Sequence, residues 1–154
     1  VESRRSQIMP SFEDEFVRKL YATWISFLPP NAFSYPLEMK NDERGWLSEF
    51  IKAKAFGQVF ISRTKPGVTR GNHWHNTKVE KFLVVSGEAC IRFRKIGEKE
   101  VFESLVEGEE LRVVDIPVGY THSITNIGNE DLITIFWADE IFDALRQDTY
   151  YEGI

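Results

Sequence analysis

The chain contains only three histidines, and all of them lie in two short segments beside one acidic residue. His73 and His75 flank a single residue, and on an extended strand residues i and i+2 point to the same face. Glu80 opens the next apolar run, where an inward carboxylate is unfavourable unless a positive group pairs with it. His122 follows a Pro-Gly turn and brings a third imidazole inward. These four residues predict a site for one divalent metal ion.

Imidazole and carboxylate ligands together are typical of zinc, iron, nickel, manganese or copper sites, and three His with one Glu do not select among these metals. A zinc site of this composition leaves room for water or a substrate oxygen, which is typical of catalytic sites. The general base and acid are left open among Tyr120, Lys78, Lys81 and an unbound metal ligand. His73 is the candidate base if the metal uses only three protein ligands.

The elements that position these residues are predicted to be strands. From Gly45 onward, short runs rich in Val, Ile and Phe alternate with Gly, Pro and Asn. Many short strands at a spacing of roughly ten residues are typical of a sandwich or a barrel. We expect strands at 46–51, 57–64, 79–85, 88–96, 100–106, 110–116, 122–127 and 132–138.

Two segments outside these strands have a helical period. Residues 11–28 place apolar side chains on one stripe, with Ser11 as the candidate cap and two prolines after Leu28. This helix either docks on the barrel, docks on a partner subunit, or is the last helix of an upstream domain. Residues 138–146 are expected to form a second helix that closes an end of the barrel.

The bulk composition excludes some classes of function. A chain of 154 residues fits one domain. The net charge of −5, without a long basic block, argues against nucleic-acid binding, which needs a concentrated Lys/Arg face. Cys90 is the single cysteine, so a reducing compartment is the simpler expectation. Because no membrane-spanning segment and no signal peptide is visible, we expect a cytoplasmic protein.

The spacing of these residues resembles both motifs of the cupin superfamily. The second motif usually has a glycine six positions before its proline, and Leu111 stands there instead, which affects a turn and not a ligand. The resemblance implies an all-β cupin double-stranded β-helix, or jelly-roll barrel, here preceded by an N-terminal amphipathic helix. The matching residues are Gly67, His73, His75, Glu80 and Gly87 in the first motif, and Pro117, Gly119, His122 and Asn126 in the second.

The residues before the first two histidines narrow the resemblance. Arg70 and Gly71 precede His73 as in the cupins that act on nucleotide sugars, where the arginine lies near the diphosphate. An arginine suits this role through its planar, bidentate guanidinium. Arg70 is therefore a candidate substrate-binding residue, and Lys78 is the second one. His73 and Tyr120 are the candidate catalytic residues.

A longer resemblance covers nearly the whole chain. The segments 33–52 and 57–89 are similar to the C-terminal half of the CapF-type bifunctional enzymes of capsular polysaccharide synthesis. These join an upstream short-chain dehydrogenase domain to a cupin. By this resemblance, residues 1–44 are a linker and junction helix, and residues 45–154 the cupin domain.

What the CapF-type resemblance implies about activity is specific. The cupin would carry Zn2+ and invert C3 of a UDP-2-acetamido-2,6-dideoxy-4-hexulose. The upstream domain would then reduce the C4 ketone with NADPH on the route to UDP-N-acetyl-L-fucosamine, in a homodimer. The alternatives are an iron-dependent cupin dioxygenase and a non-catalytic sugar-binding cupin module.

Overall fold

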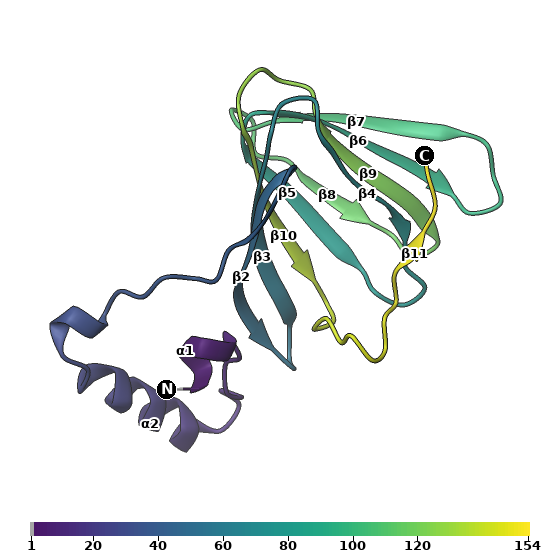
Figure 1. Ribbon diagram of the computed structural model, residues 1–154. Coiled ribbons are helices and arrows are strands. Elements are labelled where there is room, and N and C mark those ends of the chain that lie inside the picture. The colour runs from purple at the N-terminus through teal and green to yellow at the C-terminus, as the bar shows by residue number, and fades with distance from the viewer. Residues whose placement is uncertain (1) are drawn as a thin grey trace.

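The computed structural model describes residues 2–154, and most of them form two antiparallel β-sheets that face each other as a barrel (Figure 1). A pair of short helices precedes the barrel on one side. The prediction of an all-β fold preceded by a helix is confirmed. The strands are β1 Lys40–Asp42, β2 Gly45–Ala53, β3 Gly57–Thr64, β4 Thr69–Trp74, β5 Glu80–Ser86, β6 Glu88–Lys95, β7 Val101–Glu107, β8 Val113–Ile116, β9 Tyr120–Asn126, β10 Leu132–Ala138 and β11 Tyr150–Tyr151.

The strand order brings distant segments of the chain together around the barrel interior. One sheet has the order β1-β2-β3-β10-β5-β8, and the other has the order β11-β4-β9-β6-β7. Strands β4 and β9 are neighbours in one sheet, whereas β5 belongs to the other. Residues on the inner faces of these three strands therefore approach one another from two opposite walls.

Apolar side chains from both sheets fill the space between them. Inner positions alternate with outer ones along each strand, as the two-residue period of a strand requires. In β10, for example, buried and half-buried residues alternate without a break. The buried cluster contains Phe82, Val84, Ala89, Ile91, Val106, Val114, Ile116, Ile124, Leu132 and Phe136.

The N-terminal segment contains the helices α1 (Glu2–Ser6) and α2 (Glu15–Ser26) and the 3-10 turn η1 (Pro30–Ala32). The predicted helix over 11–28 is confirmed in its centre but begins later. Asp14 caps it by accepting a hydrogen bond from the backbone N–H of Phe16, so Ser11 is not the cap. None of the residues of α2 is buried.

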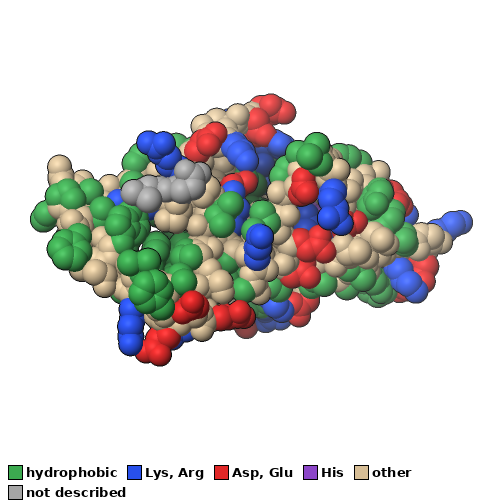
Figure 2. Space-filling model, turned by 90° about the horizontal axis from the view of Figure 1, so that it is seen from below, with side chains coloured by type: hydrophobic (Ala, Val, Ile, Leu, Met, Phe, Trp, Pro, Cys, Tyr) green, Lys and Arg blue, Asp and Glu red, His purple; other side chains and the backbone are tan. Residues whose placement is uncertain are grey.

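This segment contacts the barrel at one place. Ile8 pairs in parallel with Lys52 of β2, and the backbone groups of Lys52 hydrogen-bond to Gln7 and Met9 at 2.8 and 2.7 Å. In α2, Phe16 is 70% exposed, and Phe27, which follows the helix, is 82% exposed. Figure 2 shows hydrophobic side chains gathered at the end of the molecule that α1 and α2 form.

Two predictions about irregular segments are wrong. Residues 138–146 form no helix, because Phe142 and Leu145 find no apolar surface to pack on and a helix this short needs tertiary contacts. Leu145 in it is 94% exposed. Residues 40–42, within the segment 1–44 that was expected to be a linker and junction helix, form the edge strand β1. None of the helices in residues 2–154 is long and apolar enough to cross a membrane.

Candidate metal centre

Strand β4 carries the first histidine and is bent by a β-bulge just before it. Its register against β9 shifts between Gly71 and His73, which makes Asn72 the extra residue. Gly71 and Asn72 have positive φ angles of 96° and 59°, and a Cβ on Gly71 would lie 2.7 Å from the carbonyl oxygen of His122. Glycine is needed at such a close approach, and bulges re-aim side chains beside functional sites. The bulge places His73 directly opposite His122.

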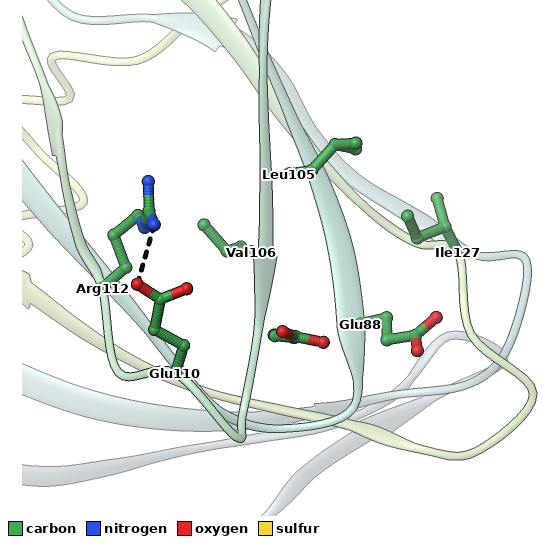
Figure 3. Close-up of a pocket in the computed structure, with 7 residues that line it drawn as sticks. Glu88, Leu105, Val106, Glu110, Arg112 and Ile127 are labelled. Carbon is green, nitrogen blue, oxygen red and sulfur yellow. Dashed lines mark hydrogen bonds and ion pairs between the residues drawn. The ribbon is translucent and has the colours of Figure 1, made fainter.

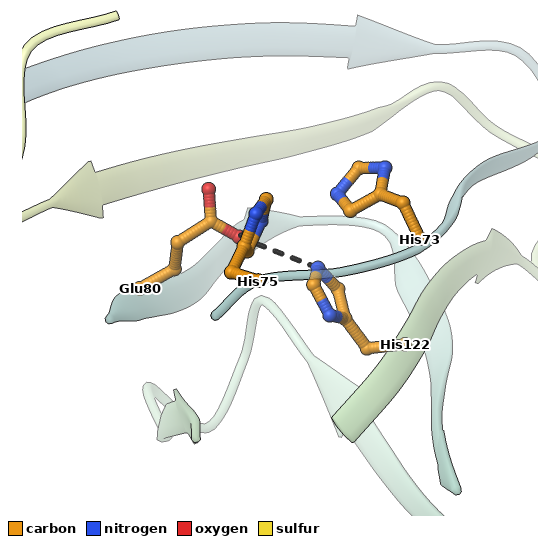
Figure 4. Close-up of side chains that lie close together, drawn as sticks. All are labelled: His73, His75, Glu80 and His122. Atoms are coloured by element: carbon orange, nitrogen blue, oxygen red, sulfur yellow. Dashed lines mark ion pairs between the residues drawn. The ribbon is translucent and has the colours of Figure 1, made fainter. Parts of the chain in front are cut away.

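The structure brings together all four residues that the spacing predicts as ligands. One ligand atom from each of them lies within 4.8 Å of the others. The Nε2 atoms of His75 and His122 are each 3.3 Å from Oε2 of Glu80, which enters from the facing sheet. Figure 4 shows the three rings and the carboxylate pointing toward a common centre. His73 is half-buried, and the other three are buried.

Backbone carbonyl groups orient two of the three rings. Nδ1 of His75 hydrogen-bonds to the carbonyl oxygen of Asp148, and Nδ1 of His122 to that of Tyr120 at 3.2 Å. A carbonyl oxygen can only accept, so both Nδ1 atoms carry the proton. Both Nε2 atoms therefore present a lone pair to the centre, which is the arrangement that metal-binding histidines show.

These lone pairs provide a test of whether the site fits a metal ion. The Nε2 atoms of His75 and His122 are buried and have no hydrogen-bond partner within the described residues. Buried polar atoms are normally satisfied, and an unsatisfied one calls for an explanation such as an ion. A divalent cation among these atoms and Glu80 would pair them, so the donor set fits such a cation.

The electrostatics of the cluster keep the ligands in the forms that bind metals. Burial, followed by the charges of His122 and His75, lowers the pKa of His73 to about 4. Burial acts to raise the pKa of Glu80, but the contacts with His122 and His75 outweigh it and hold that pKa well below its usual range. A neutral imidazole and an ionised carboxylate are the species that coordinate metals.

Three of the four residues, His73, Glu80 and His122, line a cavity of about 210 Å³. The wall of this cavity also contains Arg44 and Arg70. Nε of Arg70 donates to Oγ1 of Thr64 at 2.8 Å. No ion-pair partner for Arg70 occurs in the described part of the chain. Burial and the nearby charge of Arg44 lower the pKa of the Arg70 guanidinium. Arg44 is paired with Asp42, so the half-buried Arg70 is the cation without a counter-ion that makes this wall suited to an anionic ligand.

The other candidate residues differ in their distance from the centre. Lys78 has a largely buried side chain, and its Nζ lies 3.7 Å from Oε1 of Glu80. Lys81 points outward and forms an ion pair with Asp115. Tyr120 is half-buried at the start of β9, where its backbone oxygen holds His122, and its side chain is not among the groups that line the cavity.

Sequence reasoning did not find two residues at the site. Arg44 lies in the turn before β2 and lines the cavity. Its sequence context, Asp-x-Arg-Gly, indicates a turn and gives no sign of a role at a site. Asp148 lies near the C-terminus, 73 residues after His75, yet its carbonyl oxygen contacts the His75 ring. It carries no motif, so only the fold reveals it.

A different hollow, of about 310 Å³, lies away from the cluster and is lined by residues of β6, β7 and the following turns (Figure 3). Two of its charged groups, Glu110 and Arg112, pair with each other. No imidazole or thiol lines it. It therefore offers no donor set comparable to the histidine cluster.

Comparisons with known proteins show the family to which the chain belongs. The sequence family described as polysaccharide biosynthesis C-terminal domain matches residues 40–150. A UDP-2-acetamido-2,6-beta-L-arabino-hexul-4-ose reductase of Pseudomonas aeruginosa is 41% identical over 148 residues, which are 96% of this chain and 40% of the relative. The chain thus spans well under half of that relative's length.

Solved structures show the same relationship. The capsular polysaccharide assembling protein CapF of Staphylococcus aureus superposes with a TM-score of 0.96 at 50% identity, over 99% of this chain and 42% of that one. CapF is also known in complex with the inhibitor 3-isopropenyl-tropolone. An oxalate decarboxylase of Lactobacillus farciminis, 22% identical, matches 68% of this chain and 31% of its own with a TM-score of 0.57, which supports the fold alone.

The expected cupin fold and the expected CapF-type resemblance are both confirmed. The chain belongs to the family of polysaccharide biosynthesis C-terminal domains.

Proposed function

We propose that this chain is the epimerase part of a bifunctional capsule enzyme and inverts C3 of a UDP-2-acetamido-2,6-dideoxy-4-hexulose on the route to UDP-N-acetyl-L-fucosamine. The observation that carries the proposal is the convergence of His73, His75, Glu80 and His122 beside a cavity whose wall contains an arginine without a counter-ion. Metal ligands and an anion-binding wall in one cavity suit a charged nucleotide sugar.

The reduction named for the Pseudomonas relative is assigned to the rest of the protein. A Rossmann domain binds a dinucleotide on a parallel sheet, whereas all strand pairs within the two sheets described here are antiparallel. We therefore place NADPH in an upstream short-chain dehydrogenase domain, as the short coverage of the relative supports. The division into a junction segment, residues 1–44, and a cupin domain, residues 45–154, is part of this proposal.

The proposed chemistry needs no change of oxidation state. The hydrogen on C3 lies next to the C4 ketone, so its removal leaves an enolate, and return of a proton to the opposite face inverts the centre. A divalent cation, which we propose to be Zn2+, supplies positive charge that stabilises the enolate oxygen. The protein must then provide one group that takes a proton and one that returns it.

His73 is the candidate for the group that takes the proton. Unlike His75 and His122, its ring is not held by a backbone carbonyl within the described residues. It is also the most exposed of the three rings. His73 can therefore serve as a ligand or, with the other three residues holding the metal, as the base.

Two other side chains are candidates for the remaining roles. Lys78 reaches Glu80 from the adjoining loop, and its amine could contact the substrate or deliver a proton. Tyr120 is the second candidate for the acid, at the barrel end where β9 begins. Arg70, with Arg44 beside it on the cavity wall, is assigned to the diphosphate, because a cavity of about 210 Å³ has room for a sugar but not for a whole nucleotide.

Other parts of the proposal concern the assembly and the metal. We propose a homodimer in the cytoplasm, where UDP-sugars are made, in agreement with a buried free Cys90. Tropolones carry adjacent oxygens that chelate divalent cations, and a structure of CapF with the inhibitor 3-isopropenyl-tropolone is known. The same chemistry makes 3-isopropenyl-tropolone a useful probe of the present chain.

The proposal is tested by hydrogen exchange at C3. The chain is incubated in deuterated water with a UDP-2-acetamido-2,6-dideoxy-4-hexulose, and deuterium at C3 is followed by NMR or mass spectrometry. We expect incorporation that EDTA abolishes and added Zn2+ restores. Substrate binding without exchange would instead indicate a sugar-binding module, and bound iron with oxygen consumption would indicate a dioxygenase.

The variant His73→Asn distinguishes the two possible roles of His73, metal ligand and general base. If His73 is the base, His73→Asn should keep its metal and lose exchange by about 100-fold or more, the range for general base catalysis. If His73 is mainly a ligand, the same variant loses metal and exchange together. An exchange rate equal to that of the wild type would remove His73 from both roles.

A further inference from the structure

Asp148 lies in the C-terminal segment, yet its carboxylate caps the loop that joins the histidine pair to Glu80. The backbone N–H groups of Asn76, Thr77 and Lys78 donate to it at 2.9, 2.7 and 2.9 Å. Three successive N–H groups converge on one carboxylate, as they do at an anion-binding turn. The conformation of the whole loop thus depends on a residue far away in the sequence.

The backbone of the same residue holds a metal-ligand ring. The carbonyl oxygen of Asp148 accepts the hydrogen bond from Nδ1 of His75. This contact directs Nε2 of His75 toward Glu80, where it has no other partner in the described structure. Asp148 therefore makes two kinds of contact. Its side chain binds the loop, and its backbone carbonyl binds the His75 ring.

The capped loop also places Lys78. Its backbone N–H is held by Asp148, and its side chain turns back so that Nζ lies 3.7 Å from Glu80. Glu80 follows directly after this loop, as the first residue of β5. Asp148 thus positions three groups around the centre: the His75 ring through a direct hydrogen bond, and Lys78 and Glu80 through the loop.

The residues after Asp148 fasten it to the barrel. Tyr150 and Tyr151 of β11 pair with Trp74 and His73 of β4, and the ring of Tyr150 stacks on that of Trp74 at 4.4 Å. Further on, Glu152 donates its backbone N–H to Asn72 at 2.9 Å, accepts from Thr121, and forms an ion pair with Arg94 at 2.8 Å. The C-terminal segment is thus bound along the strand that carries the histidines.

We propose that Asp148 is a positioning residue of the metal centre, and that metal binding and docking of the C-terminal segment, residues 148–153, are coupled. Loss of the Asp148 carboxylate frees the loop from the C-terminal segment, so the backbone carbonyl of residue 148 is no longer held against the His75 ring. The coupling is reciprocal, since a ligand that favours the docked state must itself be favoured by docking. This inference rests on the metal-binding part of the proposed function and not on the substrate.

Metal affinity measured on the full chain tests the proposal. Competition with a chromophoric chelator gives the Zn2+ affinity of the wild type, Asp148→Ala and Asp148→Asn. We expect Asp148→Ala to weaken binding by about 10–100-fold, the usual effect of losing a group that orients a ligand. Asp148→Asn keeps one oxygen acceptor for the loop and should lose less.

Asp139→Ala is the matched control. Asp139 also caps this loop, since its Oδ1 accepts from the backbone N–H of Val79 at 2.9 Å, but no contact joins it to a ligand ring in the described residues. The Zn2+ affinity of Asp139→Ala should lie within a few-fold of that of the wild type. Equal losses in the two alanine variants would overturn the proposal, because general loosening of the loop would then explain both.

Two further readings keep the test independent of folding. In the metal-free state, long-range 1H–15N spectra should show the proton of His75 on Nδ1 in the wild type and a mixture of tautomers in Asp148→Ala. Hydrogen exchange of the backbone amides of residues 148–153 should slow when Zn2+ is added. Unchanged tautomer and affinity in a folded Asp148→Ala would contradict the inference alone, whereas a wild type that binds no metal would contradict the proposed function.

Discussion

The two ends of the chain are attached to the barrel in opposite ways. At the N-terminal end, a bridge between Ile8 and Lys52 holds two helices, and Phe16 and Leu20 of α2 stay exposed. At the C-terminal end, residues 148–153 pair with β4 and contact two of the predicted metal ligands, His73 and His75. The C-terminal segment is therefore a part of the site, whereas the N-terminal helices present a surface that the barrel leaves uncovered.

This difference shows how the same fold can support two separate tasks. The site needs rigid support, because ligand side chains must be held closely for tight metal binding. The exposed face of α2 has the opposite character, since contiguous apolar side chains on a surface mark a site of contact with another protein part. In the proposed bifunctional enzyme, the upstream reductase domain joins the chain at this end.

Truncation of the chain from each end should give the largest difference in Zn2+ affinity between the two ends. Removal of residues 148–154 takes away the acceptor of His75 and the cap of the loop, so Zn2+ affinity should fall by about 100-fold. Removal of residues 1–39 should leave the affinity within a few-fold of the wild type. Chelator competition on both truncated chains measures this, and a larger loss from the N-terminal deletion would reverse the comparison.

Single aromatic and aliphatic side chains should repeat the contrast in stability. Tyr150→Ala removes the ring that stacks on Trp74 and should lower the free energy of unfolding by about 1–2 kcal/mol. Leu20→Ala, at a residue of α2 that is 56% exposed, should change it by no more than about 0.5 kcal/mol. Urea unfolding at low protein concentration gives both values. A larger effect at Leu20 would mean that the face of α2 is already covered.

How far the sequence predicts this arrangement depends on the range of the interactions. The strands 57–64 and 132–138 are found with their predicted bounds, because the alternation of apolar residues is a local property. The four ligands were predicted from the His-x-His spacing, from the inward position of Glu80 and from the resemblance to the two cupin motifs, all of which can be read in the sequence. The helix expected over 138–146 fails, because its periodicity has no apolar partner in the fold.

What escaped the sequence is mostly the second layer of the site. Asp148 and Arg44 act through contacts with residues far away in the chain, and neither stands at a spacing that indicates a role. The bulge at Asn72 is likewise a property of strand pairing. Only the three-dimensional structure shows that the loop after His75 is closed by the C-terminal segment.

A charged group beside the N-terminal attachment should show the smallest effect. Glu49 accepts from Nζ of Lys52 at 2.6 Å, and although burial acts to raise its pKa, the hydrogen bonds from Lys52 and Lys40 lower it below its usual range. A carboxyl group with a lowered pKa stabilises the folded state above its unfolded pKa, and this stabilisation is lost as the pH falls through the folded value.

Glu49→Gln should therefore lower stability by at most about 1 kcal/mol at pH 7, as expected for a partly exposed ion pair. The difference from the wild type should shrink once the pH falls below the ordinary carboxyl pKa of about 4.3. Thermal unfolding between pH 7 and pH 3 tests it in the metal-free chain. A difference that grows toward low pH would contradict the sign.

The central claim is that His73, His75, Glu80 and His122 bind one divalent ion, and calorimetric titration with Zn2+ tests it most directly. The account predicts one ion per wild-type chain, and loss of that binding in His75→Ala while the circular dichroism of the barrel is kept. His75→Ala that binds Zn2+ as tightly as the wild type, or a folded wild type that binds none, would contradict it.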